Sequence, residues 1–552
     1  MDTGMTEPGR FRHHLQDFVT VAPNFRNRKK NTGKIPMTVF PLQTPLLPDI
    51  IALHGKWRAS DPALICEDRL VTWQAFAENQ NRVAHGLLAL GLKKGDRVAV
   101  VMSNSIEMVE ILFGIFRAGC VAVPLNLAVS DDHMVRMIKD CGARALIVTA
   151  DQASRFAALP HDLAPLRLCA GEVNENWIDY ATWKENQPSD PPDIPLAPDD
   201  PINIIYSSGT TGTPKGIVHT QQGRLNFAQA ISLALHYSGK IRTLVNIGLY
   251  SNISWVSMIC TLLNGGTLII QKKFDALDFL TAVQELRITH CSMVPVQFQQ
   301  ILELKGQEKF DLSSLRAVMS CGSPLHASLK EKLCARLSGS LIELYGLTEG
   351  ISTTIEPEDG LLRPASVGKP NLSVDLKIIG PDGREMPPGE KGEIVGRSNF
   401  LMSGYFNRKD ATEEATWTDE AGKKWLRTGD LGHLDEEGFL YLTGRLKDMI
   451  LSGGQNIYPE DLETVLMQHD AISEAAVIGI KSRRWGETPL ALVVLHKGKP
   501  VPAEDIREWC NARLGRQQKI SMLKIVNHLP RNPNGKILKN ILREKYGNIT
   551  CD

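Results

Sequence analysis

The chain has 552 residues, and its 62 Lys and Arg balance its 62 Asp and Glu to a formal net charge of zero. At about 100–200 residues per domain, this length predicts roughly three or four folding units, large enough to bury a core without disulfide or metal staples. With 43% hydrophobic and 22% charged residues, the composition is typical of a soluble globular protein and excludes a disordered, collagen-like or coiled-coil chain. Because no basic excess marks a nucleic-acid-binding domain, we expect no nucleic-acid partner.

The cysteines, the N-terminus and one uncharged stretch bear on the compartment. Ten cysteines are scattered with no CxxC pair, unlike the disulfide framework of a small secreted domain, and the first fourteen residues lack the apolar run of a secretory signal. Residues 243–271 carry no charge and could cross a bilayer, but Asn, Ser and a Gly-Gly pair interrupt them with groups that hydrocarbon disfavours. We expect a buried helix, a glycine turn and a core strand there, no transmembrane segment, and a cytoplasmic location.

The first large segment alternates strand and helix patterns. Val98–Met102, Cys120–Val123 and Ala145–Val148 are short apolar runs suited to buried strands. Between the first two runs, Ser105 can cap a helix that Gly119 ends. Strand, crossover helix and strand in this order predict parallel sheets covered by helices, and thus an α/β fold.

The second half changes character twice. Residues 184–201 hold six prolines and predict a linker, which leads into a buried strand at Ile202–Tyr206. Near Glu436–Leu442 the pattern becomes a hairpin, which predicts a small β subdomain. After Arg445 the chain predicts a compact α+β unit, with strands near 475–480 and 490–495 and a helix near 503–514. We therefore expect a large N-terminal domain over residues 1–445 and a small C-terminal domain over residues 446–552.

The strongest local signal is a loop rich in Gly, Ser and Thr that follows the predicted strand at 202–206. Its glycines allow tight turns, its hydroxyls supply donors and its lysine adds a point charge, so it suits polyphosphate oxygens. It is not a Walker A loop, because the glycine spacing and the residue after the lysine differ. The candidate phosphate-binding residues are Ser207, Ser208, Gly209, Thr210, Thr211, Gly212, Thr213 and Lys215.

This loop resembles the phosphate loop of the adenylate-forming superfamily, which comprises acyl-CoA synthetases, nonribosomal-peptide adenylation domains and firefly luciferase. Further blocks follow in the order of that superfamily and extend the resemblance over nearly the whole chain. They are the adenine-side loop Ser320–Leu325, the aromatic-Gly-x-Thr-Glu block Tyr345–Glu349, the ribose block Trp425–Asp430, the hinge block Gly444–Asp448, the segment Ser452–Pro459 and the terminal lysine block Pro530–Lys536.

The resemblance implies ATP-dependent activation of a carboxylic acid to an acyl-adenylate, followed by transfer to the thiol of coenzyme A. A carboxylate and the α-phosphate of ATP repel each other, so local cations decide whether they can approach. Lys536 is implied as the catalytic cation that bridges them. Thr348 would donate to phosphate, and Glu349 together with Thr211 would anchor Mg²⁺, a hard cation held by few carboxylates plus substrate phosphates.

The same resemblance assigns the remaining nucleotide and thiol contacts. Asp430 would accept both ribose hydroxyls, as an ionised acceptor can, and Arg445 would steady the ribose or phosphate. Lys447 matches the hinge about which the C-terminal domain rotates between the two half-reactions. The adenine would lie between one face formed by Tyr345 and Gly346 and another formed by Gly322, Ser323 and Pro324. The CoA tunnel would be lined by Ser452, Gly453 and Gly454.

The acyl pocket departs from the common pattern of acyl-CoA synthetases. Where many of them carry Pro-Leu-Phe-His, this chain has Gly248-Leu249-Tyr250-Ser251, so Tyr250 or Trp255 replaces the usual aromatic gate. The candidate pocket residues are Tyr250, Ser251, Trp255 and Gly322.

Amino-acid adenylation domains place an aspartate near this position to hold the substrate ammonium. None lies between Arg242 and Lys272, so a buried ammonium would lack its partner. The chain also ends sixteen residues after Lys536, which disfavours a following carrier domain.

We therefore expect a free-standing CoA ligase for a hydrophobic acid, with fatty and aryl or alicyclic acids both open. Two alternatives are an adenylating enzyme with another acceptor, such as a carrier protein or luciferase-like oxidation, and a nucleotide-binding sensor without catalysis. A homodimer is also left open.

Overall fold

The computed structural model describes residues 45–156, 160, 163–172, 176–207, 215–337, 339–453, 455–515, 518–531 and 535–551. Within them the chain from Pro45 onward forms one compact unit. No helix among these residues is long and apolar enough to span a membrane.

The first sheet contains the strands predicted near 98, 120, 145 and 202. Its inner strands run parallel to one another. At one edge, two further strands follow, and each pairs antiparallel with the strand before it. Its described strands, in spatial order, are β19 (Gly404–Tyr405), β9 (Lys215–Thr220), β8 (Pro201–Ser207), β4 (Val121–Pro124), β3 (Arg97–Val101), β5 (Ala145–Thr149), β6 (Leu166–Ala170) and β7 (Ile178–Asp179).

The second sheet is parallel at its centre and antiparallel at both edges. Its described strands, in spatial order, are β16 (Lys369–Pro370), β15 (Ile351–Ile355), β14 (Leu341–Leu347), β13 (Ala317–Ser320), β12 (His290–Met293), β10 (Arg242–Val245), β11 (Thr267–Ile270), β1 (Pro62–Cys66) and β2 (Arg69–Thr72). The predicted mainly parallel α/β architecture is confirmed.

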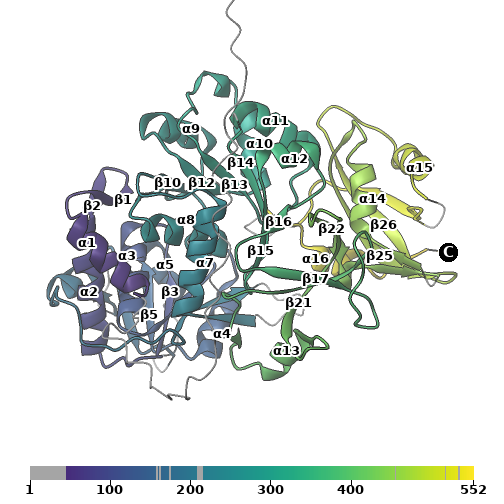
Figure 1. Cartoon of the computed structure of the whole chain (residues 1–552). Coiled ribbons are helices and arrows are strands. Elements are labelled where there is room, and N and C mark those ends of the chain that lie inside the picture. Colours follow the sequence, from purple (N-terminus) through teal and green to yellow (C-terminus); the bar gives the residue numbers. More distant parts are fainter. Residues whose placement is uncertain are drawn as a thin grey trace, which may run out of the picture. The chain divides into compact units, whose positions relative to one another are not determined.

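Helices separate the two sheets and cover their outer faces (Figure 1). The central core joins both sheets to α1 (Leu47–Trp57), α2 (Trp73–Ala89), α3 (Ile106–Arg117), α7 (Gln221–Ala234) and α8 (Asn252–Leu263). The outer face of the first sheet packs on α4 (Asp131–Cys141). The outer face of the second sheet packs on α9 (Ala276–Glu285), α10 (Pro295–Glu303) and α11 (Ala327–Leu337). Short helices α5 (Ala150–Ala153), α6 (Tyr180–Glu185), α12 (Pro357–Leu362) and α13 (Lys409–Glu414) complete this part.

The central strands are buried on both faces, as parallel strands covered by helices must be. In β3, Val98 and Val100 face the central core, whereas Ala99 and Val101 face the α4 side. The following helix α3 begins where the sequence predicts, because the Ser105 hydroxyl accepts a hydrogen bond from the Met108 amide at 3.2 Å.

The uncharged stretch folds as expected for a buried segment. It contains the end of β10, then α8, a turn at Gly265–Gly266, and β11. Helix α8 is buried on nearly every side between the two sheets, which explains why its sequence resembles a membrane span without being one.

The small β subdomain is an antiparallel sheet of β17 (Asp375–Ile379), β18 (Gly392–Arg397), β21 (Lys424–Leu434) and β20 (Thr416–Thr418), with β22 (Leu440–Arg445) paired to β21. The hairpin predicted near residues 436–442 is confirmed, and its strands extend farther on both sides than the sequence indicated. This extension carries the hairpin to Asp430 and Arg445.

The C-terminal segment forms the predicted α+β unit. Its sheet orders β24 (Gln455–Ile457), β23 (Ile450–Ser452), β26 (Gly486–Leu495), β25 (Ile472–Ser482) and β28 (Thr550–Cys551), with β27 (Met522–Ile525) beside β26. One face packs on α14 (Pro459–Leu466) and α15 (Ala503–Arg513), and the other packs on α16 (Lys539–Tyr546). The domain boundary at residue 445 stays a prediction.

The aromatic cluster between the sheets allows a test of core stability. Phe113 is fully buried, and its ring centroid lies 5.4 Å from that of Phe76 and 5.2 Å from that of Phe116. We expect Phe113→Ala to lower the free energy of unfolding by about 3–5 kcal/mol, because it removes buried area and leaves a cavity. The matched change Trp57→Ala, at a side chain 73% exposed, should cost less than about 0.5 kcal/mol. Urea unfolding measures both, and equal losses would contradict the assigned core.

Candidate active site

The phosphate-loop candidates follow β8, at the edge where parallel strands β4 and β8 both end. Residues 208–214 lie outside the described residues, and so does the side chain of Ser207, the last residue of β8. Lys215 opens β9, and its Nζ lies 4.9 Å from the ring centroid of Tyr405 in β19. Lys215, the lysine of the predicted loop, therefore contacts β19, and β19 lies next to the Glu349 side chain.

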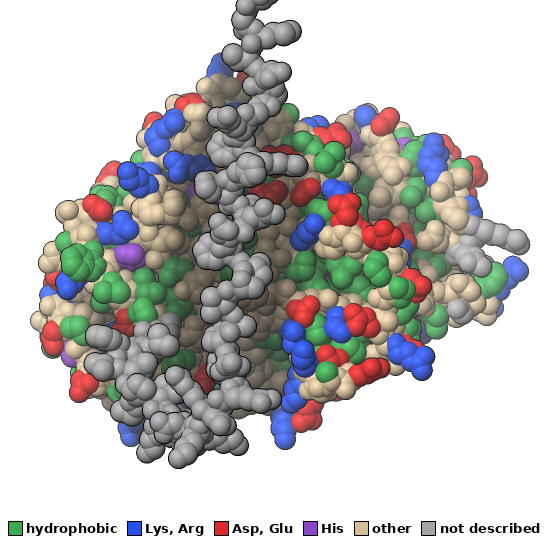
Figure 2. All heavy atoms as spheres, in the orientation of Figure 1, with side chains coloured by type: hydrophobic (Ala, Val, Ile, Leu, Met, Phe, Trp, Pro, Cys, Tyr) green, Lys and Arg blue, Asp and Glu red, His purple; other side chains and the backbone are tan. Residues whose placement is uncertain are grey.

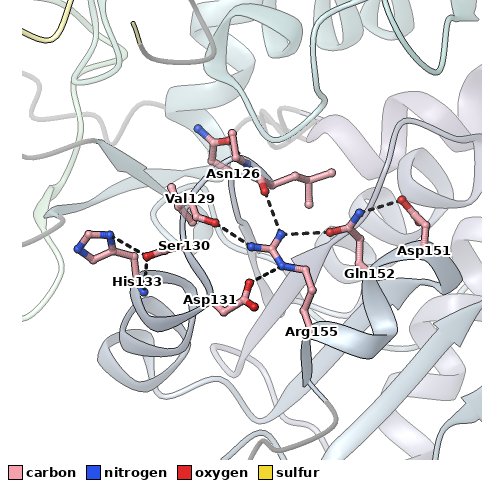
Figure 3. A network of polar contacts seen from close by, with 10 residues as sticks. Asn126, Val129, Ser130, Asp131, His133, Asp151, Gln152 and Arg155 are labelled. Carbon is pink, nitrogen blue, oxygen red and sulfur yellow. Dashed lines mark hydrogen bonds and ion pairs between the residues drawn. The ribbon is translucent and has the colours of Figure 1, made fainter. Parts of the chain in front are cut away.

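Arg155 holds the segment that follows β4 in place through hydrogen bonds (Figure 3). Its guanidinium donates to the carbonyl oxygens of Leu127 and Val129 at 2.9 and 2.7 Å, to Asp131 at 2.6 Å and to Gln152 at 3.1 Å. This network fixes the segment that follows β4, and β4 is the parallel neighbour of β8.

A tight turn from Thr348 to Gly350 joins β14 to β15 and carries two predicted catalytic residues. All three backbone carbonyl oxygens of this turn accept hydrogen bonds. The His219 ring donates to Thr348 at 2.7 Å, and the Met402 amide donates to Glu349 at 2.8 Å. A serine hydroxyl donates to Gly350 at 2.7 Å. Gly350 has φ +109°, and a Cβ there would lie 2.5 Å from the Phe400 carbonyl oxygen, so the turn requires glycine. The sequence analysis missed His219 as a support of this turn.

The Glu349 carboxyl is buried beside the Tyr405 hydroxyl. The Tyr405 hydroxyl donates to its Oε1 at 3.0 Å, and burial raises the pKa of the Glu349 carboxyl. Among the described residues, no three His, Cys, Asp or Glu side chains form a group that could hold a metal ion. The donor set at Glu349 therefore fits a cation that takes one protein carboxylate and fills its shell with phosphate and water oxygens, which is how Mg²⁺ binds.

Three predicted nucleotide residues contact one another directly. The Tyr345 hydroxyl donates to Asp430 Oδ2 at 2.8 Å, and Arg445 Nε lies 2.8 Å from Asp430 Oδ1. Burial, reinforced by the Asp430 carboxylate, raises the pKa of the Tyr345 phenol, so it stays protonated and donating. Two of the roughly four acceptor positions of the Asp430 carboxylate remain for a ligand hydroxyl pair.

Strand register brings these residues together. Asp430 and Arg445 are paired across β21 and β22, and the Asp430 amide donates to the Thr428 hydroxyl at 3.0 Å, which holds the backbone at Asp430. The sequence indicated each residue separately but not their mutual contacts.

Lys536 lies in the same electrostatic environment. The pKa of its ammonium is lowered to about 8, first by burial and then by the Arg445 cation, and the Asp430 carboxylate opposes both effects. The preceding Gly535 packs near Val296 of α10, because a Cβ at Gly535 would lie 3.3 Å from Val296 Cγ1. Gly535 therefore lies beside α10, which packs on the second sheet, whereas residues 532–534 of the terminal lysine block are outside the described residues.

The predicted hinge and CoA segments lie just beyond Arg445. Burial and the Arg445 charge lower the pKa of Lys447. Ser452 ends β23, and the Gly453 amide donates to the Trp485 carbonyl oxygen at 2.8 Å. The Trp485 ring covers Gly453 so closely that a Cβ would lie 2.7 Å from it. Gly454 lies outside the described residues.

The acyl-pocket candidates occupy the start of α8. Ser251 caps the helix, and the Tyr250 ring folds back over Gly248, where a Cβ would lie 2.2 Å from Tyr250 Cε1. Trp255 is 1% exposed, belongs to the central core and donates its indole N–H to the Leu249 carbonyl oxygen at 2.9 Å.

The adenine-side candidates include a buried hydroxyl that no described residue satisfies. Gly322 and Pro324 are exposed, whereas Ser323 Oγ is buried without a hydrogen-bond partner among the described residues. Such a group calls for a ligand or water partner. Gly346, on the other predicted face of the adenine, is exposed.

The face seen in Figure 2 carries Lys and Arg interspersed with Asp and Glu, as the zero net charge implies.

Two family models match this chain. The AMP-binding enzyme model matches residues 54–406, and the AMP-binding enzyme C-terminal domain model matches residues 461–536. The two matched ranges fall on opposite sides of the predicted boundary at residue 445.

Curated relatives cover most of the chain. This chain is 34% identical over 484 residues to the long-chain-fatty-acid–CoA ligase FadD13 of Mycobacterium tuberculosis, and the match covers 87% of this chain and 94% of the relative. It is 34% identical over 481 residues to feruloyl-CoA synthase of Amycolatopsis sp., with coverages of 86% and 94%. It is 31% identical over 519 residues to the fatty acid–[acyl-carrier-protein] ligase ScoC of Streptomyces coeruleorubidus, with coverages of 91% and 97%.

Solved structures agree with these matches. The o-succinylbenzoate CoA synthetase MenE from Bacillus subtilis, in complex with its acyl-adenylate intermediate, has a TM-score of 0.79 at 30% identity and covers 91% of this chain and 99% of its own. The amide bond synthetase McbA from Marinactinospora thermotolerans has a TM-score of 0.82 at 26% identity, with coverages of 91% and 100%. The chain therefore belongs to the AMP-binding enzyme family, as an ATP-dependent, AMP-forming acid–thiol ligase of the acyl-CoA synthetase type.

Proposed function

We propose that this ligase adenylates a hydrophobic carboxylic acid, either fatty or aryl/alicyclic, to acyl-AMP with release of pyrophosphate, and then forms the thioester with coenzyme A. In the first step a carboxylate oxygen attacks the α-phosphorus of ATP and pyrophosphate leaves. In the second step the CoA sulfur attacks the acyl carbon and AMP leaves with the bonding electron pair.

The observation that carries the proposal is the common electrostatic environment of Lys536, Arg445 and Asp430. At about 4 Å and an effective dielectric near 20, two unit charges interact by about 4 kcal/mol. A cation at Lys536 between the carboxylate and the α-phosphate turns a repulsion of this size into attraction for both anions. Such charge stabilisation is most of what phosphoryl-type transfer requires of a protein.

The nucleotide is assigned to the residues around this cation. Asp430 accepts the ribose hydroxyls with the acceptor positions that Tyr345 and Arg445 leave, and the Tyr345 ring faces the adenine. The orphan Ser323 hydroxyl supports an adenine contact on the opposite side. Lys215 and the loop at 207–213 bind the phosphates.

Glu349, with Thr211 from the phosphate loop, is the proposed holder of Mg²⁺, and Thr348 donates to phosphate. The ion would supply charge neutralisation of the phosphate oxygens when bound. The protein contributes the fixed turn and the Tyr405 hydrogen bond that orients the carboxylate.

The acid is proposed from the acyl segment and from the relatives. Relatives named for fatty acids and for ferulic acid both match over most of the chain, which supports a hydrophobic acid without choosing a chain or a ring. Tyr250 and Ser251 would contact it, with Gly322 across the pocket and Trp255 forming its floor from the core. The segment 242–272 has no carboxylate to hold a substrate ammonium.

The acceptor is proposed to be CoA, presented by Ser452–Gly454 after a rotation about Lys447 of the domain-closure type. One relative is named for an acyl-carrier protein and one structural neighbour for amide bond synthesis, which favours a different acceptor as the second candidate function.

A carboxylic acid panel with hydroxylamine trapping tests the proposal, because it detects acyl-adenylates whatever the acceptor. We expect acid-dependent pyrophosphate release with fatty or aryl acids and none with amino acids. Addition of CoA should then give AMP and thioester. Adenylate formation without thioester would favour another acceptor, and no acid-dependent pyrophosphate release with any acid would exclude the ligase.

The role of Lys536 predicts an asymmetric loss. Lys536→Ala should lower acyl-adenylate formation by ~10²-fold or more, because it removes a charge that stabilises the transition state. The thioester half-reaction from supplied acyl-adenylate should change far less. Lys499→Ala, an exposed lysine in the same unit whose Nζ donates to the Asp470 carbonyl oxygen at 3.0 Å, is the matched control and should change neither. Equal losses in both half-reactions would refute the assignment.

The lowered pKa of Lys536 predicts a pH dependence. The ammonium is charged below its pKa of about 8, so kcat/KM for ATP in adenylation should fall as pH rises through about 8. Lys536→Arg should move this limb to much higher pH, since a guanidinium stays protonated. Burial raises the pKa of the neighbouring Glu460 carboxyl to about 7, so its titration must be distinguished from that of Lys536. Glu460→Gln should leave the limb of the pH profile near 8. A limb that moves with Glu460 instead of Lys536 would contradict the prediction.

A further inference from the structure

Arg224 is a buried cation with neutral partners. It lies in α7, is 1% exposed, and donates from Nε to Asn203 Oδ1 at 2.8 Å and from one terminal nitrogen to Asn252 Oδ1 at 2.9 Å. Its other terminal nitrogen lies 3.2 Å from His219 Nδ1. Within the described part of the chain no carboxylate forms an ion pair with it. Burying a charge in this way is costly, so a purely structural role is better served by an apolar side chain.

Aromatic rings and amide oxygens keep Arg224 charged. Its guanidinium carbon lies 4.8 Å from the ring centroid of Trp255 and 5.5 Å from that of Phe227, both favourable contacts for a cation. Burial lowers the pKa of Arg224 to about 9, which still leaves it protonated at neutral pH. The arginine is therefore a fixed donor with a set geometry.

This donor determines how the two neighbouring side chains are oriented. Arg224 needs an acceptor at Asn203, so the Asn203 amide turns its oxygen to Arg224 and its nitrogen to His219 Nδ1, 3.1 Å away. His219 Nδ1 then faces two donors and must be the unprotonated ring nitrogen. The ring proton lies on Nε2, which donates to the Thr348 carbonyl oxygen at 2.7 Å.

We propose that His219 and Arg224 are positioning residues for adenylation: the arginine fixes the Nε2-protonated form of His219, and this ring holds the Thr348–Glu349 turn against the ATP phosphates. The inference rests on the proposed role of that turn. Arg224 also holds Asn252 at the start of α8, so one side chain braces the phosphate end and the acyl end of the site.

Two variants of His219 test the hydrogen bond. His219→Leu removes the donor and leaves the partly buried Thr348 carbonyl without this hydrogen bond, and an unpaired carbonyl away from water is costly. We expect KM for ATP in pyrophosphate exchange to rise about tenfold or more, with the thioester half-reaction from supplied acyl-adenylate within about twofold. His219→Gln can accept from Arg224 and donate to Thr348, so it should recover most of the loss. Equal KM values for the two variants, or equal losses in both half-reactions, would overturn the proposal.

A second measurement reads the ring directly. In the protein labelled with ¹⁵N-histidine, the two His219 nitrogens, assigned by their absence in His219→Gln, should report an Nε2-protonated, Nδ1-unprotonated ring. In Arg224→Met, which keeps length and apolar volume, Asn203 is free to turn and the two shifts should converge toward a tautomer average. A wild-type ring protonated at Nδ1, or an unchanged spectrum in Arg224→Met, would refute the inference.

The outcomes separate this inference from the proposed function. If the wild type releases no pyrophosphate with any acid, the proposed function fails while the ring measurement still stands or falls alone. If the wild type is active and Glu349→Gln impairs ATP use but His219→Leu does not, the positioning role fails alone. Circular dichroism and the thermal midpoint of each variant identify misfolding, and a misfolded His219→Leu leaves the decision to the Gln variant and the spectra.

Discussion

Repulsion between two anions is the constraint on which this cleft depends. A carboxylate and a triphosphate must come within bonding distance, and each unit-charge contact at about 4 Å is worth about 4 kcal/mol at an effective dielectric near 20. The proposed site meets this repulsion with cations drawn from distant parts of the chain. Lys215 opens a strand of the first sheet, Arg445 ends the β subdomain hairpin, and Lys536 lies in the C-terminal unit. No single segment could supply them, which accounts for the wide spacing of the blocks along the sequence.

The carboxylates of the site are handled by a different principle. Buried ionised groups are tolerated only where hydrogen bonds and opposite charges satisfy them. Asp430 has a donor on each oxygen, whereas Glu349 has a tyrosine hydroxyl and an elevated pKa. Asp430 is therefore a preorganised acceptor. In the protein alone, the Glu349 carboxyl has fewer stabilising partners than the Asp430 carboxylate. A cation or a phosphate-bound ion therefore stabilises Glu349 more than it would stabilise Asp430.

Local sequence patterns predicted local structure well, but they did not predict how strands far apart in the sequence meet. Ser105 marked the start of α3 because a cap is a short-range interaction. The Tyr345–Asp430 hydrogen bond joins residues 85 apart, and only the meeting of two sheets creates it. Trp255 belongs to the central core, and the sequence did not indicate this, since helix burial depends on what packs on each side. Arg224 carried a readable signal: it is the sole charged residue in the α7 sequence.

The position of the hinge relative to these groups bears on how one cleft can serve two reactions. Asp430 and Arg445 are strand partners that precede the predicted hinge residue Lys447, while Lys536 follows it. A rotation about Lys447 would therefore remove the bridging ammonium and leave the ribose acceptor with its arginine and tyrosine. The adenylate would stay anchored by its sugar while the charge that favoured its formation departs. The lost cation also ceases to stabilise ATP and the acid at the same centre, so the rotation itself opposes the reverse reaction as the thiol arrives.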